Sequence, residues 1–93
     1  MGSQNRLPQP RAARYGEGMD HDLDATGLLC PLPVLKARKR LQPLAPGEVL
    51  RVRTDDPAAV VDIPHFCAEQ GHGLHDDGPE GSAHRWRIVK GGA

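Results

Sequence analysis

The sequence predicts an α+β fold, a two-layer α/β sandwich in which two helices cover one face of a four-stranded mixed sheet. Apolar residues follow a helical spacing in two segments and alternate with polar residues in several others. Proline and glycine separate these segments, and the order that results is β-α-β-α-β-β. The chain has 93 residues, so we expect one small domain, and only 3% of them are aromatic, so its core should be mainly aliphatic.

The first strand and helix surround a cysteine. His21 to Ala25 alternates polar and apolar side chains, as a short strand does, and a loop over residues 26–29 leads to Cys30. From Pro31 to Leu44 apolar residues recur every three or four positions, which predicts a helix that ends before Pro46-Gly47. The residues of this stripe are Val34, Ala37, Leu41 and Leu44.

A second strand and a second helix follow. Residues 47–54 alternate again and predict a strand. Asp55-Asp56-Pro57 has the composition of a helix start, with a capping carboxylate before a first-turn proline. Residues 57–71 then favour a helix, but Pro64 disfavours helical geometry in the residue before it. We therefore expect either a kink there or a second helical piece over residues 64–70.

The chain is predicted to end in two further strands. Residues 74–76 indicate a short strand, residues 77–81 a turn or hairpin loop, and residues 84–90 the last strand, with Trp86 facing inward. We expect the first two strands to pair in parallel through a right-handed crossover. Cys30 would then emerge at the carboxyl end of the first strand, a common position for sites in α/β folds.

Composition bounds the domain and the compartment. Residues 1–19 contain scattered arginine, proline and glycine without apolar periodicity, so we expect a disordered N-terminal extension before a domain over residues 20–93. No apolar run approaches 18 residues, and the formal net charge is zero, which gives no general argument for membrane or nucleic-acid binding. Two cysteines without a secretory signal favour free thiols in the cytoplasm.

Cys30 is the strongest candidate for a functional residue. Because helices tolerate proline in their first turn, Pro31 and Pro33 predict a helix that starts at about Pro31 and has Cys30 as its N-cap. The positive end of the helix dipole should lower the pKa of this thiol and make it a better nucleophile. The backbone N–H groups of Leu32 and Val34 would stabilise the anion, since the two prolines have none.

Two groups of basic residues have a structural and a functional interpretation. The first helix carries a basic patch that is either a solvated face or a docking site for an acidic partner, and the open face of the sheet carries arginines that are either inert or bind RNA. Because Trp86 is predicted to face inward, no aromatic side chain is left for stacking on bases, and direct nucleic-acid binding is not expected. The residues are Lys36, Lys39 and Arg40 on the helix, and Arg51, Arg53, Arg85 and Arg87 on the sheet.

The second cysteine and the histidines near it also have two interpretations. Cys67 lies beside Phe66 at core spacing, so we expect a buried thiol, with a resolving partner for Cys30 as the alternative. His65, Cys67, His72 and His75 could form a zinc site, but their spacing matches no compact finger. We therefore expect ordinary surface histidines and neither a metal ion nor another cofactor.

Four short motifs occur in order along residues 20–92, and together they resemble the TusA/SirA-like sulfur-carrier family. The family fold is the same two-layer sandwich, related to the C-terminal domain of translation initiation factor 3. The motifs are Leu23-Asp24-Ala25-x-Gly27-Leu28-x-Cys30-Pro31-x-Pro33, Asp55-Asp56-Pro57, Asp62-Ile63-Pro64-x-Phe66-Cys67 and Lys90-Gly91-Gly92.

The resemblance implies a carrier-type sulfurtransferase. Cys30 would accept a sulfane sulfur as a persulfide from a cysteine desulfurase or a rhodanese-type donor and relay it to an acceptor protein, in tRNA thiolation, sulfur metabolism or a cofactor-related pathway. Leu29 and Leu32 replace a basic and an acidic residue of the best-known member, so the partner-facing surface should differ. The alternative is a non-catalytic regulatory or interaction module that binds through its basic helix and its arginine-bearing sheet face.

Overall fold

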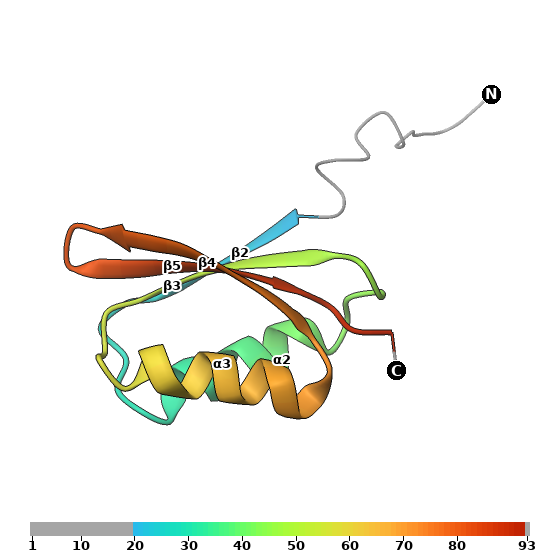
Figure 1. Ribbon diagram of the computed structural model, residues 1–93, viewed down its shortest axis with the longest axis horizontal. Helices are drawn as coiled ribbons and strands as arrows, with labels where there is room; N and C mark the ends of the chain where they lie inside the picture. Colours follow the sequence, from blue (N-terminus) through green and yellow to red (C-terminus); the bar gives the residue numbers. More distant parts are fainter. Residues whose placement is uncertain (1–19, 93) are drawn as a thin grey trace.

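The computed structural model describes residues 20–92, and the extension predicted over residues 1–19 lies outside them. The described chain forms a four-stranded sheet with two helices that both lie on one of its faces, which confirms the predicted fold class (Figure 1). The elements are β2 (Asp20–Ala25), α2 (Leu32–Leu41), β3 (Val49–Thr54), α3 (Ala59–Gln70), β4 (Gly73–Glu80) and β5 (Ala83–Val89).

The strand order β2-β3-β5-β4 places the parallel pair on one side of the sheet and the C-terminal hairpin on the other. β2 and β3 pair in parallel, as predicted, and the remaining neighbours are antiparallel. The carboxyl ends of β2 and β3 therefore meet at one end of the molecule, where the loops that enter α2 and α3 lie side by side (Figure 1).

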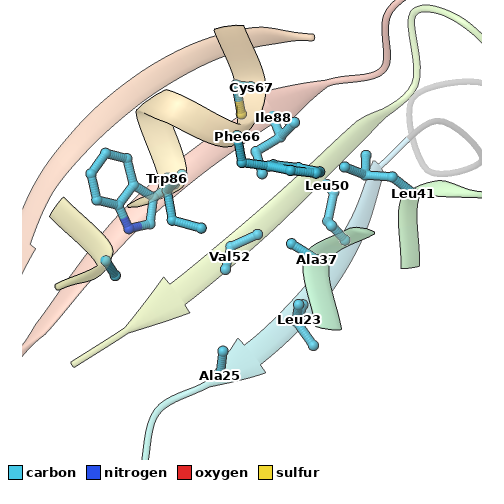
Figure 2. Packing of buried hydrophobic residues seen from close by; sticks show 12 residues of the cluster. Leu23, Ala25, Ala37, Leu41, Leu50, Val52, Phe66, Cys67, Trp86 and Ile88 are labelled. Carbon is cyan, nitrogen blue, oxygen red and sulfur yellow. The ribbon is translucent and has the colours of Figure 1, made fainter. Parts of the chain in front are cut away.

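The core lies between the helices and the inner face of the sheet (Figure 2). Alternate residues of β3 and β5 are buried, as predicted, because strand side chains point to opposite faces in turn. The two buried polar groups of this layer satisfy each other: the Trp86 Nε1–H donates to Thr54 Oγ1 at 3.0 Å. The most fully buried large side chains are Trp86, Leu41, Leu50, Ile63, Ile88 and Val52.

Strand β4 is longer than the sequence suggested. It runs from Gly73 to Glu80, so the loop predicted over residues 77–81 is wrong. A register shift between Asp76 and Gly78 absorbs the glycine, which has a φ of 85° and donates its N–H to Asp76 Oδ1 at 2.9 Å. Pro79 is tolerated because β4 is an edge strand, where one side of the backbone needs no partner.

Both helices begin later than predicted, and α3 is a single element. Helix α2 starts at Leu32 rather than Pro31 and stops at Leu41 rather than Leu44. Helix α3 starts at Ala59 and continues through Pro64 without a break, so two separate pieces are ruled out. Proline removes one N–H, and the buried face of α3 offsets that loss by packing on the sheet.

Candidate functional site

Two aspartates of the β3–α3 loop hold the loop that carries Cys30. Asp55 Oδ1 accepts the Gly27 N–H at 2.9 Å, and Asp56 Oδ2 accepts the Cys30 N–H at 2.6 Å. The other Asp56 oxygen accepts the Ala58 N–H at 3.2 Å, just before α3. The parallel pairing of β2 and β3 brings these groups together, so the Asp55-Asp56 pair fixes the cysteine loop as well as the helix start.

Cys30 is exposed and lies one residue before the N-cap of α2, which is Pro31. Of the two N–H groups predicted to stabilise its anion, that of Leu32 already donates to Leu29 O at 2.8 Å. Within residues 20–92, no backbone oxygen accepts the Val34 N–H. The helix terminus therefore offers the sulfur fewer free amides than the sequence suggested.

The pKa of Cys30 is raised, not lowered, and this corrects the sequence-based expectation. The main cause is a hydrogen bond to the Asp62 carboxylate; desolvation and the negative charges of Asp62 and Asp56 act in the same direction. A carboxylate beside a thiol disfavours the thiolate by charge repulsion and favours the S–H form by accepting its proton in a hydrogen bond. The resting side chain is accordingly a thiol at neutral pH.

Cys30 opens onto a groove of about 270 Å³ between α2 and α3. The α2 side contributes mostly apolar surface, and the α3 side contributes mostly polar and charged side chains, with an aromatic residue at its base. This groove would bring any sulfur compound or peptide that reaches the thiol against Asp62. The lining residues are Cys30, Pro31, Val34, Leu35, Arg38, Asp62, His65, Phe66, Glu69 and Gln70.

The predicted site residues around Cys30 separate into two groups. Pro31 and Val34 line the groove with the thiol, whereas Pro33 is buried against the core and has a packing role. Leu32 is 45% exposed, and with Leu29 (69%) and Leu35 (49%) it gives the cysteine end of α2 an apolar surface.

The basic patch of α2 does not border the groove. Lys36, Lys39 and Arg40 are exposed, and Arg40 donates to Asp22 O of β2 at 2.6 Å, so it points toward the sheet edge. Arg38 is the α2 cation that lines the groove, a position that was not predicted from the sequence. The spacing along the helix indicates this position, because Arg38 follows Val34 and Leu35 by four and three residues and so lies on the same face of α2.

Three of the four arginines on the open sheet face pair with acidic side chains of the flanking strands, and the fourth, Arg85, donates to the backbone carbonyl of Asp77 at 2.9 Å. Arg51 contacts Asp20 and Asp22 at 3.1 and 3.2 Å, and Arg87 contacts Asp77 at 2.8 Å. Arg53 contacts Glu80 at 3.3 Å. These pairs neutralise much of the positive charge and weaken the interpretation of this face as an RNA-binding or partner-binding surface.

Cys67 is a core thiol. Its side chain is 1% exposed and packs in the cluster that includes Phe66 and Ile88 (Figure 2). Burial raises the pKa of Cys67 to about 11, so it is a poor nucleophile, and both cysteines are free. Within residues 20–92 no three His, Cys, Asp or Glu side chains lie close enough to hold a metal ion.

The fold and the groove define a class: a small α+β domain that presents one exposed cysteine at the start of a helix. Comparison with known proteins identifies the family. The family model for sulfurtransferase TusA matches residues 21–90, and the chain belongs to this family of sulfur carriers. It is also similar to the crystal structure of a SirA-like protein from Desulfitobacterium hafniense, at 27% identity and a TM-score of 0.69, over 78% of this chain and 99% of that one.

The part of the chain that the structure describes contains no helix long and apolar enough to cross a membrane.

Proposed function

We propose that this protein carries sulfane sulfur as a persulfide on Cys30 and relays it to an acceptor protein. The observation that carries the proposal is the exposure of Cys30 on a loop held by two aspartates, at the mouth of a groove. Family membership supports the same chemistry. Cys67 is buried and has a raised pKa, which leaves Cys30 as the thiol available to a partner.

The transfer needs no net oxidant. Cys30 loses its proton, and the thiolate attacks the outer sulfur of a donor persulfide; the donor S–S bond breaks, and the donor cysteine leaves as a thiolate that takes up a proton. The outer sulfur of the Cys30 persulfide is then attacked by an acceptor thiolate, and Cys30 leaves. Each step breaks one S–S bond and forms another, so the group transferred is a neutral sulfur atom.

The partners we propose are a cysteine desulfurase or a rhodanese-type protein as donor and a sulfur-relay protein with a reactive cysteine as acceptor. The apolar surface formed by Leu29, Leu32 and Leu35 beside the thiol supports contact with a protein. We place the reaction in the cytoplasm, where both free cysteines would stay reduced.

Sulfur loading tests the proposal directly. The protein is incubated with a cysteine desulfurase and cysteine, and its intact mass is measured before and after reduction. We expect a gain of one sulfur atom that dithiothreitol removes, present in Cys67→Ala and absent in Cys30→Ser.

The Cys67→Ala variant is the matched control because it removes the only other cysteine. Loading that persists in Cys30→Ser, or wild-type protein that accepts no sulfur from either a desulfurase or a rhodanese, would refute the proposal. When the loaded protein is then incubated with an acceptor protein that carries a reactive cysteine, its mass should return to the value measured before loading.

A further inference from the structure

Asp62 is the charged group of the groove most closely associated with the thiol. It lies in the first turn of α3 and lines the groove with Cys30, and its carboxylate is the main cause of the raised pKa of that thiol. Within residues 20–92 it has no cationic partner within 4.0 Å, whereas Asp20, Asp22 and Asp77 are all paired with arginines. No ion pair within the described residues therefore compensates its negative charge.

The other charged groups of the site do not neutralise Asp62. Asp56 adds a second negative charge, and its two oxygens accept backbone N–H groups. His65 and Glu69 contact each other along α3 at 3.7 Å. Arg38, across the groove on α2, forms no ion pair with any described residue. The negative charges of two carboxylates thus act on the thiol, and no cation among residues 20–92 forms an ion pair with either of them.

We propose that Asp62 gates Cys30: its carboxylate holds the thiol protonated in the free carrier, and a cationic side chain that the partner places beside Asp62 releases the thiolate. This inference rests on the proposed function, since the partner is the sulfur donor or acceptor. The consequence is selectivity, because the site favours sulfur compounds whose reactive sulfur lies close to a positive charge and reacts slowly with neutral ones.

The physical reason is local electrostatics. A cation near Asp62 cancels the charge that repels the thiolate and competes for the carboxylate oxygen that accepts the S–H proton. In water-like surroundings two unit charges about 4 Å apart attract enough to change an equilibrium roughly fivefold. At an exposed site the effect should weaken as salt is added.

Two small disulfides test this without any sulfur-transfer partner. Cystamine carries an ammonium group near its sulfur atoms, and 2-hydroxyethyl disulfide is neutral. Each reacts as Cys30 thiolate plus disulfide, forming one mixed disulfide and releasing one thiolate. Rates of Cys30 modification are followed by intact mass at low and high salt, and each is divided by the rate for free N-acetylcysteine amide.

We expect the wild-type protein to prefer cystamine roughly fivefold after this normalisation. In Asp62→Asn the preference should fall to the smaller value left by Asp56, and the reaction with the neutral disulfide at pH 7 should become several-fold faster because more of the thiol is ionised. Asp62→Glu keeps the charge and should keep the preference. Glu80→Gln removes a carboxylate of β4 that does not line the groove, and should behave like wild type.

Circular dichroism and thermal melting confirm that each variant is folded. Equal preference for the two disulfides in wild type and Asp62→Asn, or an unchanged pH midpoint of modification, would overturn the gate. The proposed function is judged separately by sulfur loading: a carrier that loads normally while lacking this selectivity refutes only the gate, and one that shows the selectivity but accepts no sulfur refutes only the carrier.

Discussion

At the residue scale, Asp56 joins the two halves of the site. One of its oxygens accepts the Cys30 N–H at 2.6 Å, and the other accepts the Ala58 N–H at 3.2 Å. A single carboxylate thus fixes the position of the cysteine backbone relative to α3, the helix that carries Asp62.

Replacing Asp56 should therefore affect both stability and transfer. Asp56→Ala removes both acceptors, and we expect a loss of about 1 kcal/mol in the free energy of unfolding, the usual net contribution of a hydrogen bond. Sulfur loading should slow because the Cys30 loop is less well positioned. Urea unfolding and the loading time course measure the two effects. Asp56→Asn keeps one oxygen acceptor and should lose less of the free energy of unfolding. If the Asp56→Ala variant accepts sulfur at the wild-type rate, Asp56 has no role in positioning Cys30.

At the element scale, the C-terminal segment closes the end of the molecule opposite to Cys30. Lys90 Nζ donates to Leu41 O at 2.7 Å and so satisfies a carbonyl at the end of α2, where a positive charge is favourable. The Gly91 N–H donates to His72 Nδ1 at 2.9 Å. These contacts explain why the Lys90-Gly91-Gly92 motif is part of the domain although it follows the last strand.

The two glycines of this motif provide a matched pair of substitutions. A Cβ at Gly91 would overlap the carbonyl oxygen of Gly71, whereas a Cβ at Gly92 would meet only Pro46 Cβ at 3.7 Å, an ordinary contact. We expect Gly91→Ala to lower the free energy of unfolding by about 1–3 kcal/mol, as overpacking does, and Gly92→Ala to leave it nearly unchanged. Equal unfolding midpoints in urea for the two variants would contradict this account.

At the scale of the whole molecule, stability should fall in two stages as the solution is acidified. The pKa of His72 is lowered below 6.5, first by burial and second by the charge of Lys90. The His72 side chain therefore binds a proton more readily in the unfolded chain than in the folded one. Above pH 6.5 this difference costs no stability, and the free energy of unfolding falls as the pH decreases from 6.5 toward the pKa of His72 in the folded protein.

The second stage comes from carboxylates. The pKa values of Asp77 and Asp76 are lowered mainly by hydrogen bonds from Arg87 and His84, and that of Glu48 by the Ala45 N–H and then His21. These carboxylates contribute to the free energy of unfolding at pH values above the pKa of an ordinary carboxyl group, and the contribution is lost below about pH 4. Thermal unfolding at a series of pH values measures both stages; His72→Gln should remove the first and keep the second.

Several features of the fold could be predicted because local patterns agreed with packing. The alternation in β3 and β5 and the burial of Cys67 followed from periodicity, and the parallel pairing of the first two strands followed from the handedness of the crossover. Strand β4 could not be predicted as far as Glu80, because Gly78 and Pro79 indicate a turn and only pairing with β5 keeps them in a strand. That residues 1–19 are disordered stays a prediction.

The sequence by itself determined the class of fold, the family and the choice of Cys30 as the candidate site, since these depend on residue types and their spacing along the chain. The tertiary structure decided the chemical state of that cysteine. Asp56 and Asp62 lie 26 and 32 positions after Cys30, and only the crossover between the parallel strands brings them to its side. Electrostatic interactions depend on distance in space, so the local helix terminus predicted a thiolate and the assembled fold produces a thiol.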